Sequence, residues 1–281
     1  MNKYDDKYLE CPVCHSVEIN DYHSDFRGNS FSICHSCNVQ FMNPVYSDEY
    51  LDDFYSHYIP SEYSSTLVEH QNFVVKDNFD AIDNLVGTKG LMLDFGVGDG
   101  LHSSYAEKNG WQAKGYDVDC KAMDNLKEQF GLDVYCGDFF SIPWEKASYK
   151  LIYLNQVLEH LKSPAKYLEY FHQLLSDDGY LYISVPNIKS TSNKLKFMLE
   201  KLKLRKKNVG KYYDSDHHVF YYNPSSLTNL LKLNGYEVEL VRNCAKPKGN
   251  KSMLKRFIHK YITERYFYSS TFLVLAKKIT S

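Results

Sequence analysis

Between residues 90 and 187 the sequence alternates short apolar runs with amphipathic segments, and this pattern constrains the fold more than any other feature. We expect strands in the apolar runs, at residues 91–96, 113–119, 133–138, 150–155 and 180–187. We expect helices in the segments between them, at residues 102–110, 120–130 and 163–175. The pattern therefore predicts an α/β fold in which helices cover both faces of a parallel sheet. The Asp-Asp-Gly sequence at residues 177–179 is expected to form a helix-to-strand turn.

The first of these strands runs into a glycine-rich loop, LMLDFGVGDG. Three of the chain's 14 glycines, Gly96, Gly98 and Gly100, follow Asp94 there. Glycine permits a tight turn and lets a ligand lie directly against the backbone. The spacing differs from the G-x-G-x-x-G of dinucleotide sites, and no Gly-Lys-Ser/Thr follows, which excludes a P-loop. Because the acidic residues also disfavour a diphosphate, a ligand with an amino or sulfonium group and no phosphate fits better.

Two more carboxylates come at the ends of the next two strands. Asp117 lies 17 residues after Gly100, where an acidic side chain can accept hydrogen bonds from both ribose hydroxyls. Asp138 could accept one from an adenine amino group, with Phe139 packed beside the ring. Each aspartate taken alone is better explained by helix capping or a turn. Their occurrence at successive strand ends, behind a glycine loop, indicates a nucleoside site.

Together these motifs resemble those of class I S-adenosylmethionine-dependent methyltransferases, over about residues 85–190 and more weakly to residue 244. The resemblance implies a Rossmann-like fold with a seven-stranded methyltransferase sheet. It also implies that the glycine loop holds the methionine part of the cofactor, and that residues 154–156 run beneath the sulfonium. We therefore expect the cofactor to be bound by Asp94, Gly96, Gly98, Gly100, Asp117, Val118, Asp138, Phe139 and Asn155.

The first part of the chain carries four of the seven cysteines in the pattern C-x2-C-x19-C-x2-C, as Cys11, Cys14, Cys34 and Cys37. Each C-x2-C turn directs two thiolates to one point, so the two turns predict a tetrahedral site for Zn²⁺. Four protein ligands leave no open position, which indicates a structural zinc. An odd number of cysteines without an export signal favours reduced thiols over disulfides, also for Cys120, Cys136 and Cys244.

These observations divide the chain into a small zinc ribbon at residues 1–44, a helical linker or cap at 45–85, and the methyltransferase domain at 86–281. The segment CHSCNVQFMNPVYSDEYLDDFY resembles the lead-in of methyltransferases that are often encoded with sugar and surface-polysaccharide genes. The sugar C-methyltransferases begin with a similar four-cysteine zinc module. The resemblance implies a sugar or nucleotide-sugar acceptor.

Two histidines are candidates for a catalytic base, because imidazole titrates near neutral pH. His160 follows the fourth strand, and His218 lies in the DSDHHVFYYNP segment. The sugar C-methyltransferases have a Glu-His pair there, whereas this chain has His217 in place of the glutamate. His160 has a structural alternative, since the Glu-His sequence at residues 159–160 could serve only to shape the helix start and the pocket floor.

A basic segment interrupts the domain as a lid insertion at about residues 188–222. Residues 189–211 contain nine lysines and arginines and one acidic residue, Glu200, a net charge of +8, with apolar residues between them. A solvated lid helix, a clamp for a diphosphate and a peripheral contact with anionic lipid all agree with this pattern. After it we expect a helix from about Asn223–Pro224, a strand, and a last strand at 270–278.

The overall composition excludes several classes of protein. A net charge of −2 and a ribbon with three cations against six acidic residues in residues 1–44 argue against nucleic acid as a partner. No apolar stretch is long enough to span a bilayer, and the first ten residues do not form a signal peptide, so a cytoplasmic location is expected. A zinc-ribbon RNA methyltransferase and a non-catalytic scaffold are the alternative functions; the oligomeric state is open.

Overall fold

The structure is a computed structural model that describes residues 2–25, 27–56, 65–204, 213, 217–244 and 270–280. Residues 205–212 and 214–216 of the expected lid insertion, and residues 245–269, lie outside the described residues. No described helix is long and apolar enough to cross a membrane.

The larger of two sheets has seven strands, in the order β10-β11-β8-β7-β4-β5-β6, and confirms the expected fold class. Its strands are β4 (Leu91–Phe95), β5 (Gln112–Tyr116), β6 (Asp133–Tyr135), β7 (Tyr149–Asn155), β8 (Leu175–Pro186), β10 (Tyr236–Asn243) and β11 (Thr271–Lys278). The strands from β4 to β8 pair in parallel, whereas β11 is antiparallel to both its neighbours. The chain moves outward from β4 through β5 to β6 and then returns to the other side of β4. Ligands of such sheets bind at this reversal, outside the carboxyl ends of the strands.

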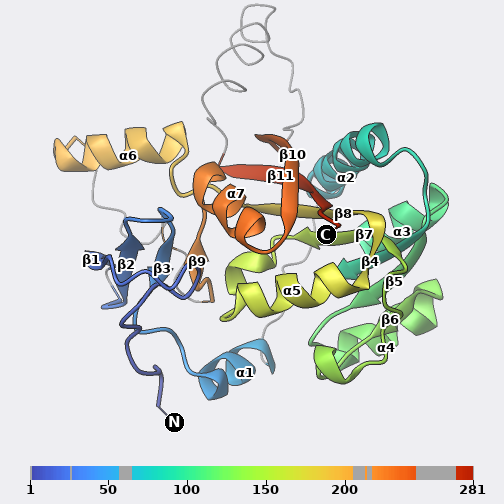
Figure 1. Cartoon of the computed structure of the whole chain (residues 1–281), viewed down its shortest axis with the longest axis horizontal. Coiled ribbons are helices and arrows are strands. Elements are labelled where there is room, and N and C mark those ends of the chain that lie inside the picture. The colour runs from blue at the N-terminus through green and yellow to red at the C-terminus, as the bar shows by residue number, and fades with distance from the viewer. Residues whose placement is uncertain are drawn as a thin grey trace, which may run out of the picture.

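Helices cover both faces of this sheet (Figure 1). They are α2 (Ser65–Val86), α3 (Leu101–Lys108), α4 (Cys120–Phe130), α5 (Pro164–Leu174) and α7 (Pro224–Leu233). Along β4, Met92 packs in a cluster with α2 and α3, and the next residue, Leu93, packs in a cluster with α5 and α7. Because successive side chains of a strand point to opposite faces, a continuous apolar run such as LMLDF is buried on both sides.

The expected turn at residues 177–179 is wrong: these residues lie within β8, which already begins at Leu175. The pairing of β7 with β8 shifts its register between Tyr149 and Leu151, so β8 starts with an irregular segment. A Cβ at Gly179 would lie 2.9 Å from the backbone oxygens of Ser176 and Tyr149. The glycine therefore allows two backbones to approach at a bulge, where the sequence pattern indicated a chain reversal.

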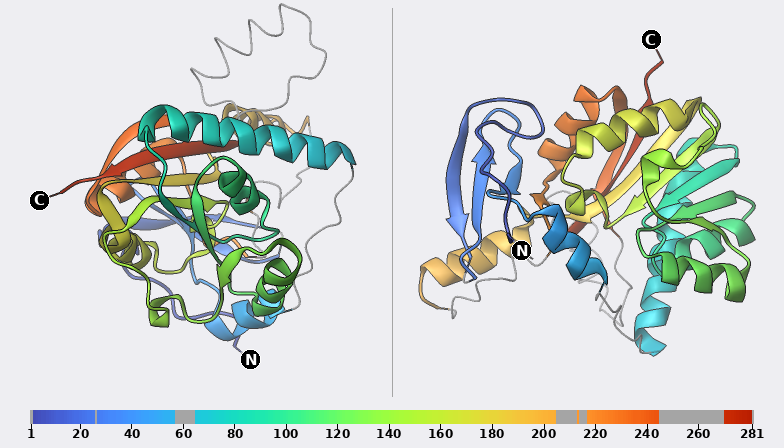
Figure 2. Two further views of the ribbon diagram at one scale, coloured as in Figure 1. Left: turned by 90° about the vertical axis from the view of Figure 1, so that its right-hand side faces the viewer. Right: turned by 90° about the horizontal axis from the view of Figure 1, so that it is seen from below.

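A second, smaller sheet joins the first part of the chain to a short strand near residue 220. It consists of β1 (Ile19–Ser24), β2 (Ser30–Cys34), β3 (Gln40–Met42) and β9 (Phe220–Tyr221), in that order. β9 comes from the expected lid insertion and pairs antiparallel with β3, with Phe220 opposite Phe41. Figure 2 shows this sheet beside the main sheet, with α1 (Asp48–Ser56) next to it. Because Phe41, Phe220 and Leu158 belong to one buried cluster with the main sheet, the two sheets share a core.

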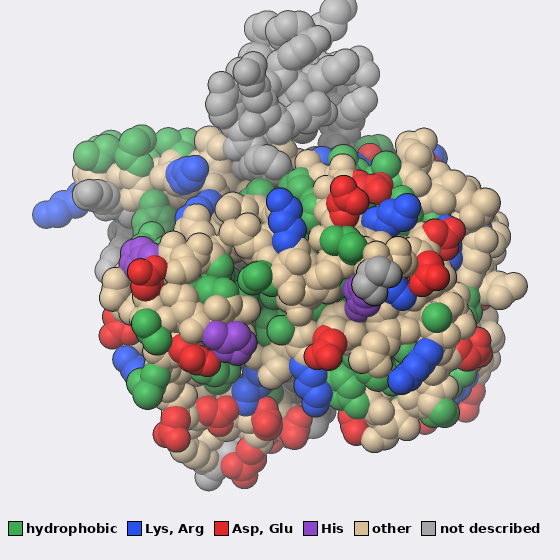
Figure 3. All heavy atoms as spheres, viewed as in Figure 1, with side chains coloured by type: hydrophobic (Ala, Val, Ile, Leu, Met, Phe, Trp, Pro, Cys, Tyr) green, Lys and Arg blue, Asp and Glu red, His purple; other side chains and the backbone are tan. Residues whose placement is uncertain are grey.

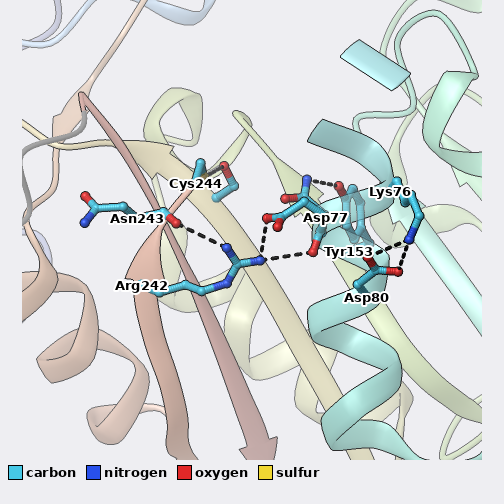
Figure 4. A network of polar contacts seen from close by, with 9 residues as sticks. Lys76, Asp77, Asp80, Tyr153, Arg242, Asn243 and Cys244 are labelled. Atoms are coloured by element: carbon cyan, nitrogen blue, oxygen red, sulfur yellow. Dashed lines mark hydrogen bonds and ion pairs between the residues drawn. The ribbon is translucent and has the colours of Figure 1, made fainter. Parts of the chain in front are cut away.

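An ion pair links α2 to the last part of the chain (Figure 4). Arg242 of β10 donates from Nη2 to Oδ2 of Asp77 at 2.6 Å and to its backbone oxygen at 3.0 Å. The next residue of α2, Asn78, donates from Nδ2 to the hydroxyl of Tyr153 in β7 at 3.0 Å. These bonds hold α2 across the sheet from β7 to β10.

Candidate functional site

A cavity of about 570 Å³ opens at the carboxyl ends of β4, β5 and β7, where the strand order reverses. Its volume lies in the ordinary range for small-molecule sites. Its lining residues are Phe95, Gly96, Gly98, Asp99, Tyr116, Asp117, Val118, Asp119, Ala122, Asn125, Leu126, Asn155, Gln156, Val157, His160, Leu161, Tyr167 and His217. The cavity therefore brings together Gly96, Gly98, Asp117, Val118, Asn155 and His160 of the residues that the sequence indicated.

The glycine loop turns sharply from β4 into α3. Gly96, Gly98 and Gly100 all have positive φ, of 86°, 53° and 75°. The backbone amides of Gly96 and Val97 both donate to the oxygen of Tyr116, at 2.7 and 3.0 Å, which holds the loop against the end of β5. A Cβ on Gly96 would lie 2.3 Å from Cγ2 of Val157, so only glycine fits there. A Cβ on Gly98 would meet nothing within 4 Å, and the backbone there is open to a ligand.

Asp117 lies directly after β5 and faces this loop. Its Oδ2 accepts a hydrogen bond from the amide of Gly98 at 3.0 Å, and its Oδ1 accepts one from the amide of Asp119 at 3.3 Å. A carboxylate has about four acceptor positions, so Asp117 retains lone pairs for two ligand hydroxyls. Asp119 in turn caps α4, because its side chain accepts from the amide of Ala122 at 3.1 Å.

Asp94 is buried beneath the loop and does not line the cavity. Its carboxylate accepts a 2.7 Å hydrogen bond from the hydroxyl of Ser103, which ties β4 to α3. Burial raises its pKa to about 7, against the opposing effect of the Ser103 bond. In this position Asp94 can support the glycine loop. It could contact a ligand in the cavity only if the loop rearranged.

Asp138 and Phe139 also lie outside the lining of the cavity. Asp138 is exposed and caps the short 3-10 helix η1 (Phe139–Ser141), accepting from the amide of Phe140 at 3.2 Å and the hydroxyl of Ser141 at 2.5 Å. Phe139 is buried, and its ring packs edge-on against Phe95 at 4.8 Å. The sequence suggested Phe139 as a contact of the adenine ring, and in the structure its side chain packs in the core.

Three histidine rings meet beside the cavity. His160 ends the 3-10 helix η2 (Leu158–His160), and His217 and His218 precede β9. The rings of His160 and His217 stack at 4.8 Å with an interplanar angle of 3°, and His218 meets His160 edge-on at 4.7 Å. One nitrogen from each ring lies within 4.8 Å of the others. Because the lone pairs of two parallel rings do not converge, this conformation suits ring packing and proton transfer and does not hold a metal ion.

The hydrogen bonding assigns different roles to these histidines. Nδ1 of His160 lies 3.2 Å from the backbone oxygen of His217. A carbonyl can only accept, so Nδ1 carries the hydrogen and the lone pair of His160 is on Nε2. Burial, and secondarily the charge of His217, lowers the pKa of His218 to about 3. His218 is therefore neutral and a weak base at neutral pH, and it does not line the cavity.

Comparison with known proteins agrees with this geometry. A family profile described as "Methyltransferase domain" matches residues 68–241, more than half of the chain. The chain belongs to this methyltransferase family. No curated protein matches it in sequence.

Solved structures with the same fold include S-adenosylmethionine-dependent methyltransferases. The 1,6-didemethyltoxoflavin-N1-methyltransferase of Burkholderia thailandensis, with S-adenosylhomocysteine bound, aligns with a TM-score of 0.54 and 16% identity over 93% of this chain and 100% of its own. A possible histamine N-methyltransferase of Thermotoga maritima aligns with a TM-score of 0.52 and 17% identity over 74% and 90%. A methyltransferase of Archaeoglobus fulgidus aligns with a TM-score of 0.51 and 17% identity over 74% and 94%. The protein is a methyltransferase enzyme, and these likenesses show its fold.

The four predicted metal-binding cysteines of this methyltransferase lie together in the small sheet. Their sulfur atoms are all within 4.8 Å of one another, with Cys11 and Cys37 at 3.6 Å and Cys14 and Cys34 also at 3.6 Å. Tetrahedral ligands with Zn–S bonds of about 2.3 Å would be about 3.8 Å apart, so the spacing fits a zinc ion. We call this group the four-cysteine cluster.

The two C-x2-C turns have the same backbone geometry. In each, the residue after the second cysteine has positive φ, 57° at His15 and 65° at Asn38, and its amide donates to the oxygen of the first cysteine at 2.9 Å. Asn38 also binds the methyltransferase domain, since its Oδ1 accepts from Nζ of Lys189 at 2.5 Å and its backbone oxygen from Nδ2 of Asn223 at 3.0 Å. The cluster is therefore fixed to both sides of the lid insertion.

The expectation of reduced thiols is wrong for one pair, because Cys120 and Cys136 form a disulfide. Cys120 begins α4 after the Asp117 loop, and Cys136 follows β6. Neighbouring parallel strands bring their carboxyl ends together, and the two Cα atoms are 5.1 Å apart, within the usual range for a disulfide. The bond joins the two loops that carry Asp117 and Asp138.

Several lining residues were not foreseen from the sequence as contacts. Tyr167 comes from α5 and packs edge-on against Phe95 at 5.5 Å, and Asn125 comes from α4. Gln156 belongs to the segment that the resemblance placed beneath the sulfonium, but its conformation was not foreseen: it has a positive φ of 60°, a strained backbone of the kind found at functional sites, and donates from Nε2 to the Ser184 hydroxyl at 3.1 Å. Strain has no sequence signal in a glutamine. His217 could have been found from the sequence, because it lies next to the candidate base His218.

Proposed function

We propose that this methyltransferase methylates a hydroxyl group of a small molecule or glycan, a sugar or nucleotide sugar of surface-polysaccharide or secondary metabolism. The observation that carries the proposal is that one cavity is lined both by Asp117 with the glycine loop and by His160 with His217. An amine attacks a methyl donor without prior loss of a proton, whereas a hydroxyl gains from a base in reach. The lead-in resemblance of residues 34–55 supports the sugar class of acceptor.

The residues at the strand ends fit S-adenosylmethionine, which supplies a methyl group already activated on a sulfonium. Asp117 would accept hydrogen bonds from its ribose, and the open backbone at Gly98 would lie against it. Asp99 and Asp119 add negative charge to the same wall, which suits a cation. Asn155 and Val157 close the wall from the end of β7, and the buried aromatic rings behind Phe95 exclude water from it.

His160 would act as the general base. Its Nδ1–H is held by the backbone oxygen of His217, so Nε2 can accept the proton of the acceptor hydroxyl as the carbon–oxygen bond forms. The stacked ring of His217 lines the cavity beside it. His218, with its lowered pKa, would pack behind the other two rings and keep them in place.

We further propose that the four-cysteine cluster binds a structural zinc ion that positions the histidines. β9 follows His218 within two residues and pairs with β3, and β3 follows the second C-x2-C turn. The amide of Met42 donates to the oxygen of Val219 at 2.9 Å, and the amide of Val219 donates to the oxygen of Glu159 at 2.8 Å. The cluster, β9 and the η2 helix that carries His160 thus form one continuous hydrogen-bonded structure.

Two substitutions separate cofactor binding from catalysis. We expect Asp117→Ala to weaken S-adenosylmethionine binding by at least about tenfold in calorimetry, because two charge-assisted hydrogen bonds are lost. We expect His160→Gln to keep the binding constant within about threefold and to lower kcat on the acceptor by about 10²–10⁴-fold. To identify the acceptor, the rate of methyl transfer to nucleotide sugars is compared with the rate of transfer to ribosomal RNA. Tight binding of NAD, methylation of RNA alone, or an unchanged kcat in His160→Gln would refute the respective part of the proposal.

A further inference from the structure

Helix α6 (Thr191–Lys201) carries an apolar face that points away from the protein. Leu195, Met198 and Leu202 recur at i, i+3 and i+7, so they share one side of the helix. Their exposed fractions are 47%, 51% and 58%, and Leu204, just beyond the helix, is 73% exposed. Figure 3 shows apolar side chains gathered along this part of the surface. Contiguous exposed apolar groups of this kind mark an interaction site. We call Leu195, Met198 and Leu202 the α6 stripe.

The opposite side of α6 attaches it to the body of the protein. A helix turns by about 100° per residue, which places Asn193 and Phe197 roughly opposite the stripe. Asn193 is buried, and its Nδ2 donates to the backbone oxygen of Asn187 at 3.2 Å. The ring of Phe197 packs edge-on against His23 of β1 at 6.0 Å. These contacts define which face turns outward, so the stripe is not covered by a small rotation of the helix.

Lysines border the stripe on both sides. On the same helical geometry, Lys194 lies along one edge and Lys196 along the other. Lys203 follows the end of the helix, with a positive φ of 58°. Residues 189–204 contain five lysines and one acidic residue, Glu200. A lysine at such a boundary can bury its methylene groups beside the apolar stripe and extend its ammonium outward. An apolar face with cations along both edges is complementary to a surface that is apolar inside and anionic outside.

We propose that the α6 stripe binds the surface of an anionic lipid bilayer, with the helix axis parallel to the membrane. The apolar side chains would enter the boundary between headgroups and acyl chains, and the flanking lysines would contact the lipid phosphates. Figure 1 shows α6 at the periphery of the molecule, beyond the small sheet. The proposal does not depend on which acceptor the enzyme methylates.

Vesicle flotation of the full chain tests the proposal. The vesicles are phosphatidylcholine alone, and equal parts of phosphatidylcholine and phosphatidylglycerol. We expect binding to the anionic vesicles only, and weaker binding as salt is raised. One variant combines Leu195→Ser, Met198→Ser and Leu202→Ser, and a second combines Lys194→Glu and Lys203→Glu. Each should bind anionic vesicles at least about tenfold more weakly.

Controls come from other exposed residues of similar type. Leu233 is 63% exposed on α7, and Lys127 is exposed on α4, so Leu233→Ser and Lys127→Glu should leave vesicle binding unchanged. S-adenosylmethionine binding, measured on every variant, checks that the fold is kept. Equal binding to both kinds of vesicle, or unchanged binding in both α6 variants, would overturn the proposal. If sedimentation shows that the wild type is a dimer and the triple serine variant a monomer, the proposal is overturned, and the stripe binds a second copy of the chain.

Discussion

Replacement of Glu159 by glutamine should reverse the sign of its effect on stability between acid and alkaline pH. Glu159 is 1% exposed, and among the described residues neither carboxylate oxygen has a hydrogen-bond partner. Burial raises its pKa from the ordinary 4.5 to about 8. The folded protein then keeps a proton that the unfolded chain has lost, so the free energy of unfolding falls as pH rises from about 4.5 to about 8.

The size of the effect follows from that interval. Each pH unit within it costs about 1.4 kcal/mol, which amounts to about 3 kcal/mol at pH 7 and at most about 5 kcal/mol above pH 8. Glutamine does not titrate, but an unpaired buried amide costs about 1–3 kcal/mol. We therefore expect Glu159→Gln to be less stable than the wild type by about 1 kcal/mol at pH 5, and more stable by about 3 kcal/mol at pH 9.

Urea unfolding at pH 5, 7 and 9, followed by tryptophan fluorescence, measures these differences. Glu169→Gln, at an exposed position of α5, is the matched control and should change stability by less than about 0.5 kcal/mol at every pH. A destabilisation by Glu159→Gln that stays the same from pH 5 to pH 9 would refute the reasoning, because it would mean that Glu159 is ionised and paired in solution.

Three further outcomes are expected. Gly96→Ala should destabilise the protein by about 3 kcal/mol or more, because its Cβ would lie 2.3 Å from Val157 Cγ2. Gly87 has a similar positive φ without that contact, so Gly87→Ala should lower the free energy of unfolding by only about 1 kcal/mol. Equal losses of stability in urea unfolding would exclude the clash. Removal of metal from the four-cysteine cluster by a chelator should abolish methyl transfer while S-adenosylmethionine binding in calorimetry falls by less than about tenfold, and elemental analysis should then show about one zinc lost per chain. A thiol reductant should lower the stability of the wild type by about 3 kcal/mol, since the Cys120–Cys136 disulfide spans 16 residues. The same reductant should not change the stability of the Cys120→Ser variant. An unchanged wild-type unfolding curve would show that the disulfide does not form.

The local patterns were sufficient to predict the main sheet and its helices. Apolar runs of strand length between amphipathic segments placed β4 to β8, because strands that are buried on both faces are predominantly apolar. The C-x2-C spacing predicted two turns that each bring two thiols together, because each turn is a local structure that needs no information from elsewhere in the chain. The glycine loop was located for the same reason, since its positive φ values admit few residues other than glycine.

Only the tertiary structure decided which of these residues face the cavity. Asp94, Asp138 and Phe139 follow strand ends as Asp117 does, yet they cap, support or fill the core, because the direction of a side chain at a strand end depends on what packs against it. The pairing of β9 with β3 joins residues that are far apart in the sequence, and it brings His217 to His160. The disulfide between Cys120 and Cys136 likewise depends on two neighbouring strand ends. Sequence determines local conformation through the backbone and the burial pattern, whereas long-range neighbours exist only once the sheet has formed.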